Sequence, residues 1–312
     1  MNIRHAICLL LTVAAAASCT DSAGLGQLDG NHSKLIIYAF PTDGDSIGIT
    51  VSLTCPMNRQ MPPLHIASIS CHTNGLPDRI VCRGDTIADG MPIARYTAVG
   101  RHRSGDTIAI TVTADGMPTA DGSTVIPQRP VVDSTRIDTA VYKGNSYPVV
   151  RLSMRGNGST PHYAVGLEGL YARPPYDASG YYQGHGQTGF VSLEIGAEPL
   201  LRSSTNIDIT LGDWDDNAFN DIYRFGSSSF TDGKATLHLY ADTYTQSDFC
   251  AYRPHLFALS TEYDSMLRSL NDINNNDLGK YGLAFAYSTY TNIRGGYGCI
   301  GAYTVAVGGW LK

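Results

Sequence analysis

Six residues near the C-terminal end have the spacing of a nucleotide-binding turn. Gly296 to Gly301 read GYGCIG, which matches G-x-G-x-x-G. In a dinucleotide site this turn joins a strand to a helix, and an acidic residue follows about 20 positions later. Here the following residues, AYTVAVGGWLK, are strand-like and include no acid. We therefore predict that these glycines bring a strand close to neighbouring backbone, or allow a bulge, and do not hold a nucleotide.

The densest acidic stretch, LGDWDDNAFNDIY, has the spacing of calcium ligands. Carboxylate and amide oxygens recur there at every second residue, as in the first half of a calcium-binding loop. The sixth position is alanine and the twelfth is arginine, so the stretch is not an EF-hand. We favour a solvated acidic turn and expect no cofactor. The alternative is a simple calcium-binding loop, whose candidate ligands are Asp213, Asp215, Asn217 and Asp221.

The stretch LYARPPYDASGYYQGHGQTGF combines tyrosines with glycine, proline and serine. Tyrosine on a small-residue backbone is the composition of binding loops, because the ring is rigid and amphipathic. The alternative is a long surface loop whose rings pack on their own domain. The candidate ligand-binding residues are Tyr171, Tyr176, Tyr181, Tyr182 and His185.

Motifs of other chemistries are missing from the sequence. It has no G-x-S-x-G and no H-E-x-x-H, and no two histidines stand four residues apart. We therefore expect a protein that is not an enzyme, with a hydrolase of unrecognised site as a remote alternative. The 28 acidic residues outnumber the 22 lysines and arginines, and no basic run occurs. Nucleic acid is not an expected partner.

The N-terminus has the form of a bacterial lipoprotein signal. A basic start and an apolar run precede the small residues Ala16, Ala17 and Ser18, which stand directly before Cys19. We predict a signal peptide over residues 1–18, lipidation of Cys19 and a polar tether over 19–33, so that the lipid attaches the protein to a membrane. A plain secretory signal that contains Cys19 is the alternative.

Export to an oxidising compartment permits disulfides. Cys71 and Cys82 flank the turn-rich segment TNGLPD, so we predict a disulfide between them. Of the seven cysteines, Cys8 lies in the predicted signal peptide and Cys19 is the predicted lipid site, which leaves five. Because five is an odd number, at least one thiol is free or pairs with another chain.

The strand pattern predicts an all-β protein. Short β-branched and aromatic runs alternate with Gly, Pro, Asn and Asp clusters along most of the chain. We predict an immunoglobulin- or transthyretin-like sandwich over 34–125, a proline-containing linker over 126–133 and a larger β-sandwich or barrel-like domain over 134–312. One helix, TEYDSMLRSLND, is expected near the C-terminal end. Its apolar stripe Tyr263, Met266, Leu267 and Leu270 fits a helix packed on a sheet, with Ser260 or Thr261 as its cap.

Several segments together are similar to one family. They are HLFALSTEYDSMLRSLND, TNIRGGYGCIGAYTV, GDTIAITVTADGMPTADGSTVIPQRPVVDS and FTDGKATLHLYA. In their order along the chain these segments resemble the DUF4249 family, lipoproteins of Bacteroidota, over essentially the whole mature chain. The sequence departs from the family pattern at Cys299 and in a longer Gly/Tyr loop around 171–190.

The resemblance implies an outer-membrane lipoprotein, on either face of that membrane, that is often encoded beside a TonB-dependent receptor for nutrients. It transfers no catalytic residue. We therefore expect a non-catalytic accessory or binding component that works with such a receptor. A structural or adhesive, fimbrillin-like lipoprotein is the alternative.

Overall fold

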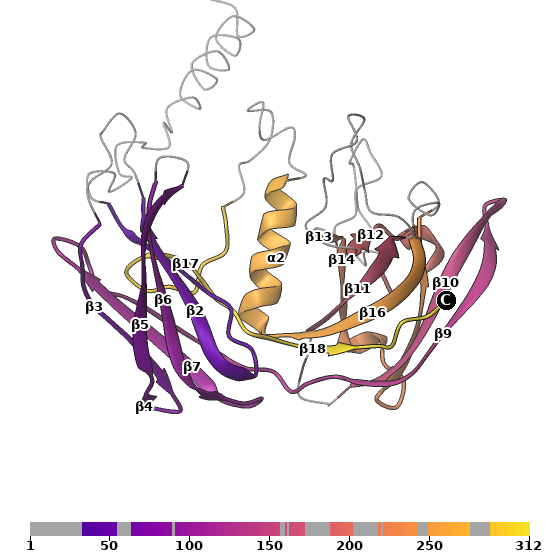
Figure 1. Ribbon diagram of the computed structural model, residues 1–312, viewed down its shortest axis with the longest axis horizontal. Coiled ribbons are helices and arrows are strands. Elements are labelled where there is room, and N and C mark those ends of the chain that lie inside the picture. Colours follow the sequence, from indigo (N-terminus) through magenta and orange to yellow (C-terminus); the bar gives the residue numbers. More distant parts are fainter. Residues whose placement is uncertain are drawn as a thin grey trace, which may run out of the picture.

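Alternation of buried and exposed residues builds strands along the whole described chain. The structure is a computed structural model that describes residues 33–54, 64–88, 91–156, 160, 162–171, 188–201, 218–219, 221–242, 249–274 and 288–312. Figure 1 shows two β units with α2 (Thr261–Asn274) standing between them. The predicted all-β fold with one C-terminal helix is confirmed for these residues.

The N-terminal unit is a sandwich of two sheets. One has the strand order β17-β1-β2-β6-β5 and the other β4-β3-β7-β8. Along β7, every second residue is buried, and Ile108, Ile110 and Val112 lie in the core between the sheets. The bounds are β1 Leu35–Ala39, β2 Gly44–Leu53, β3 Ile66–Thr73, β4 Leu76–Pro77, β5 Arg79–Ala88, β6 Met91–His102, β7 Thr107–Ala114, β8 Ala120–Val125 and β17 Tyr297–Ile300.

The C-terminal unit is a second sandwich. A three-stranded sheet, β15-β10-β9, faces a larger sheet, β13-β14-β11-β16-β18, in which β12 also pairs with β11. The bounds are β9 Val131–Tyr142, β10 Asn145–Arg155, β11 His162–Tyr171, β12 Thr188–Val191, β13 Ala218–Phe219, β14 Ile222–Gly226, β15 Lys234–Tyr240, β16 Phe249–Leu259 and β18 Tyr303–Val307. Two short 3₁₀ turns are η1 Ile195–Ala197 and η2 Ser227–Ser229.

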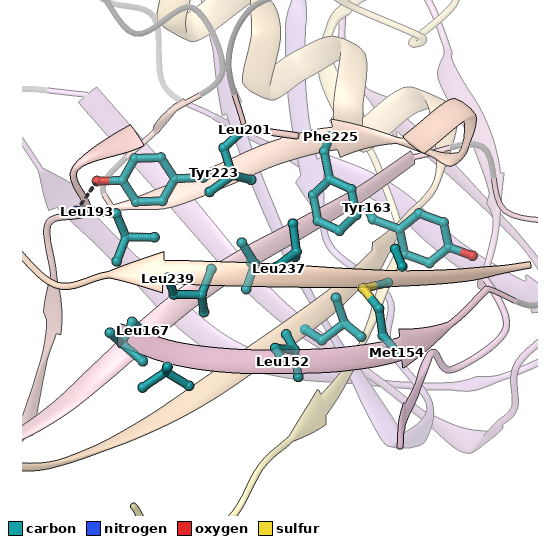
Figure 2. Close-up of a cluster of buried hydrophobic side chains, with 14 of the residues drawn as sticks. Leu152, Met154, Tyr163, Leu167, Leu193, Leu201, Tyr223, Phe225, Leu237 and Leu239 are labelled. Carbon is teal, nitrogen blue, oxygen red and sulfur yellow. Dashed lines mark hydrogen bonds between the residues drawn. The ribbon is translucent and has the colours of Figure 1, made fainter. Parts of the chain in front are cut away.

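Leucines from both sheets fill the core of the C-terminal unit. Leu152 on β10 and Leu237 on β15 pack in one cluster with Leu167 on β11 (Figure 2). The Tyr223 ring lies in this core, and its hydroxyl accepts a hydrogen bond of 2.8 Å from the Leu193 backbone N–H. The hydroxyl therefore gives a buried amide a partner, which an apolar residue could not do.

The strand β17 joins the C-terminal end of the chain to the N-terminal sandwich. It pairs in parallel with β1, with Ile37 opposite Gly298. Yellow β17 lies beside the indigo strands in Figure 1. Ile300 adds to the core of the N-terminal unit. The predicted boundary at 125 therefore leaves out a strand, because the sandwich also draws on residues 297–300.

The glycines of GYGCIG allow this pairing, as the sequence predicts. Gly298 has φ +103°, and a Cβ atom there would lie 2.0 Å from the Ile37 carbonyl oxygen. A Cβ atom at Gly301 would lie 2.8 Å from the Tyr263 Cα atom of α2. Close approach of backbone to backbone is therefore the role of these two glycines.

The helix α2 has the cap and the apolar stripe that its sequence predicts. The Ser260 hydroxyl accepts a hydrogen bond of 3.2 Å from the Tyr263 backbone N–H. It also accepts one of 3.1 Å from the Ala302 backbone N–H, which fixes the helix start to the segment between β17 and β18. The predicted stripe packs in one cluster with Ala164, Leu259 and Cys299; its members are Tyr263, Met266, Leu267 and Leu270.

The predicted Cys71–Cys82 disulfide is not present, and both thiols are free. Cys71 on β3 is buried in the core between the two sheets, whereas Cys82 is exposed on β5. The chain turns at Asn74 and Gly75, pairs back only as far as Pro77, and then enters the other sheet. The two cysteines therefore belong to different sheets and are not cross-strand neighbours.

Candidate functional site

The helix divides the outer face of the larger C-terminal sheet into a covered half and an open half. The outer face is the side opposite the core that Leu152 and Leu237 share. Over the covered half, α2 packs on Ala164 of β11 and Leu259 of β16. The helix does not cover the other end of the same strands, and the described residues there form the candidate site.

We call this open half the open patch; it consists of Glu168, Phe190, Arg253, His255, Val307 and Trp310. The register places most of these residues on one face, because directly paired residues project to the same side of a sheet. Glu168 of β11 stands opposite both Phe190 of β12 and Arg253 of β16. His255 stands opposite Val307 of β18.

A carboxylate lies at the centre of the open patch. Glu168 is 9% exposed, the Arg253 Nε–H donates to its Oε2, and His255 Nε2 lies 2.7 Å from the same oxygen. Burial acts to raise the pKa of Glu168, but hydrogen bonds from Arg253, Thr188 and His255 outweigh it and lower the pKa to about 2. The carboxylate is therefore ionised at neutral pH, and its partners are held in fixed orientations.

Aromatic rings surround this charged centre. The Arg253 guanidinium lies over the Trp310 ring, 4.6 Å from its centroid. The Phe190 ring meets His255 edge-on, with 5.4 Å between ring centroids. A Cβ atom at Gly166 would lie 2.7 Å from the Phe190 ring, so glycine leaves the space that the ring occupies.

Three large apolar side chains of the open patch face solvent. Phe190 is 40% exposed, Val307 47% and Trp310 38%. Exposed aromatic and aliphatic groups beside a pre-organised arginine are typical of the central residues of protein interfaces. The open patch is therefore suited to bind a partner surface.

Of the five residues predicted to bind ligand in the tyrosine-rich stretch, the structure describes only Tyr171. Tyr171 ends β11, and its ring packs on Phe249 with 4.5 Å between centroids. It is half-buried, which fits the alternative that the tyrosines pack on their own domain. The other four predicted residues lie outside the described residues: Tyr176, Tyr181, Tyr182 and His185.

The predicted calcium loop is also described only in part. Asp221 lies in the turn between β13 and β14 at φ +60°, and its carboxylate accepts a hydrogen bond of 2.8 Å from the Ser192 hydroxyl. Asp213, Asp215 and Asn217 lie outside the described residues. Among the residues that the structure describes, no three His, Cys, Asp or Glu side chains are grouped to hold a metal ion.

The membrane attachment predicted for Cys19 lies outside the described residues as well. Within the described ranges, no helix has the length and apolar character needed to cross a bilayer.

The sequence reasoning missed the open patch, although a signal for it is present. In HYAVGLEGL, Glu168 is the single acid inside an otherwise apolar strand. In YRPHLF, Arg253 and His255 alternate with apolar residues, so they share one face of their strand. What the sequence does not show is that these two strands are neighbours and bring the three ionisable side chains together.

Comparison with protein families gives one match. The model of the family described as "Domain of unknown function (DUF4249)" matches residues 25–308. The chain belongs to the DUF4249 family. The resemblance seen in the sequence is thereby confirmed at the level of the family, whose description names no function. No curated protein matches the sequence.

Solved structures show only faint likeness to this DUF4249 protein. The adhesin InvE of Yersinia pseudotuberculosis is 15% identical, with 77% of this chain and 58% of that chain covered and a TM-score of 0.20. A chimeric titin Z1Z2 tandem carrying a GRGDS peptide from fibronectin is 14% identical, with 73% and 91% covered and a TM-score of 0.19. The chain thus spans little more than half of the adhesin, and both scores are too low to support a common fold.

Proposed function

We propose that the protein is a non-catalytic accessory component of the outer membrane, held there by lipid on Cys19, and that it binds a TonB-dependent nutrient receptor. The observation that supports this most directly is the open patch. It combines exposed Phe190, Val307 and Trp310 with an arginine that Glu168 holds in place. The lipoprotein-type N-terminus supports the location, and the family resemblance supports the choice of partner.

The composition of the open patch favours a protein surface as the partner. Tryptophan and arginine are enriched at the residues that contribute most to protein binding, since both bury large areas and also form polar contacts. The Arg253 side chain is already fixed by Glu168 and Trp310, so little conformational entropy would be lost when a partner covers it.

The test is a pull-down of the tagged, full-length lipoprotein from native outer membranes in mild detergent, with partners identified by mass spectrometry. It compares the wild type with a double variant, Phe190→Ala and Trp310→Ala. Truncation of one interface anchor costs about 2 kcal/mol, which is about 30-fold in affinity. We expect stoichiometric recovery of a TonB-dependent receptor with the wild type and its loss with the double variant.

A matched control is Val141→Ala, because Val141 is also apolar and 71% exposed but lies on β9, away from the open patch. It should recover the receptor like the wild type. Recovery of the lipoprotein alone, or of a ladder of itself, would refute the receptor partnership and favour an adhesive role. Equal recovery by the double variant would show that the receptor binds elsewhere on the molecule.

A further inference from the structure

A hollow of about 480 Å³ lies on the covered side of the same sheet, beside α2. Its volume is within the range of small-molecule sites, about 300–1,000 Å³. Every described side chain that lines it can form hydrogen bonds. The described lining residues are His162, Thr261, Asp264, Ser265, Arg268, Ser269, Asp272, Ser288 and Tyr290.

The buried carboxylate of Asp264 is held in place from behind. Asp264 is 4% exposed, and its Oδ1 accepts a hydrogen bond of 2.8 Å from Arg224 Nε–H. Its other oxygen, Oδ2, lies 3.4 Å from His162 Nδ1 and 3.5 Å from an Arg268 nitrogen. Since His162 and Arg268 line the hollow, this second oxygen is on the hollow side, where a ligand could reach it.

Hydroxyl groups surround this carboxylate. Thr261, Ser265 and Ser288 form no side-chain hydrogen bond to any residue that the structure describes. Ser269 is different, because its Oγ accepts a hydrogen bond of 2.9 Å from the Tyr290 backbone N–H and thereby fixes one wall of the hollow. The lining therefore offers hydroxyls that act both as donors and as acceptors.

The described side chains around the hollow carry charges of both signs. Asp264 and Asp272 are negative, Arg268 is positive, and Arg224 pairs with Asp264 behind the floor. Among these described residues, neither sign is in the excess that would select a phosphate or a cation. A neutral ligand with many hydroxyl groups fits this combination of acceptors and donors.

We propose that the hollow beside α2 binds a neutral sugar of one or two rings. Asp264 Oδ2 accepts hydrogen bonds from the sugar hydroxyls, Arg268 and His162 donate to its oxygens, and the serine hydroxyls complete the network. Tyr290, which also lines the hollow, offers its ring to the apolar face of the sugar. This inference does not depend on the receptor contact at the open patch, because α2 separates the two regions of the sheet.

The test is saturation-transfer NMR on the full-length protein in detergent. The probes are d-galactose, N-acetyl-d-glucosamine and maltose, with d-galacturonate and inorganic phosphate as charged comparators. A ligand of this size is expected to bind with a Kd of about 1–10 mM. We expect saturation transfer to at least one neutral sugar, and weaker binding of the two anions.

Two variants of the lining test the position of the site. Ser265→Leu fills the hollow without touching the Asp264–Arg224 pair, and Arg268→Ala removes one donor from an exposed side chain. Each should weaken the sugar signal by about tenfold or more. Lys234→Ala, an exposed change on β15, should leave it unchanged.

Three outcomes would overturn the inference. They are saturation of no neutral sugar, equal binding by the wild type and both lining variants, and preferential binding of an anion. The melting temperature of each variant distinguishes loss of the site from loss of folding. None of these outcomes bears on receptor recovery in the pull-down, so failure of the sugar site and failure of the proposed function are separable.

Discussion

Glu168, the carboxylate at the centre of the open patch, should make stability depend on pH. Its folded-state pKa is lowered from 4.5 to about 2, which corresponds to at most about 3 kcal/mol of stability at neutral pH. Its partner Arg253 is 33% exposed, so solvent screening reduces this to about 1–2 kcal/mol. Because the folded-state pKa is the lower one, this stability is present above pH 4.5 and is lost as the pH falls toward 2.

The perturbation that isolates this effect is Glu168→Gln, which keeps the shape and removes the charge. The wild type should exceed the variant by about 1–2 kcal/mol at pH 7, and the difference should shrink toward zero between pH 5 and pH 2. Urea unfolding followed by tryptophan fluorescence at several pH values measures it. A difference that stays constant, or that grows in acid, would refute the reasoning.

The matched control is Asp115→Asn, which removes the charge of an exposed carboxylate. No side-chain partner of Asp115 is found among the described residues. Its unfolding free energy should follow the wild type within about 0.5 kcal/mol across the pH range, because exposed surface changes usually have small effects.

Three further changes probe the fold. Gly298→Ala places a Cβ atom 2.0 Å from the Ile37 carbonyl oxygen at φ +103°, so it should cost at least about 2 kcal/mol in a thermal melt. Ser260→Ala removes the cap of α2 and the partner of the Ala302 amide, and should cost about 1–2 kcal/mol. Cys82 should react with an alkylating reagent in the native protein, whereas Cys299, whose burial raises its pKa to about 12, should react only after unfolding, as read by peptide mass spectrometry.

Each of these changes has its own control or contrary result. Gly48→Ala on β2 meets no atom within 4 Å and should leave the melt nearly unchanged. Ser265→Ala, inside α2, removes a hydroxyl without a described partner and should not destabilise the helix. If both Cys82 and Cys71 resist alkylation until a reductant is added, the two cysteines form the predicted disulfide after all, and the structure is wrong on this point.

Local patterns made much of this fold predictable. Alternation in a stretch such as TIAITVTA fixes both a strand and the face that it buries, and β7 follows it residue by residue. The cap and the apolar stripe of α2 could also be predicted from the sequence, because a helix positions its side chains by local geometry alone. Long-range pairing has no such local signal, so the place of β17 in the N-terminal sheet could not be predicted.

The candidate site shows the same limit. Glu168 stands out within its own strand, yet its contacts with Arg253 and His255 depend on β11 and β16 being neighbours. Composition instead pointed to the tyrosine-rich and acidic loops. Tyr171 and Asp221 are the two members that the structure describes, and both are engaged by neighbours within the fold. Residue type identifies candidates for chemistry, whereas tertiary pairing decides which of them come together.

The parallel strand β17 affects how the protein is made. Residues that pair across β1 and β17 are about 260 positions apart in sequence, so most of the chain must leave the ribosome before the pair can form. Until then β1 presents an unpaired apolar edge, Ile36 to Tyr38, which is prone to join other strands. Before β17 is available, only a chaperone or another transient contact can shield this edge. A fragment limited to residues 34–125 would keep the edge exposed, and we expect it to aggregate where the whole chain stays soluble.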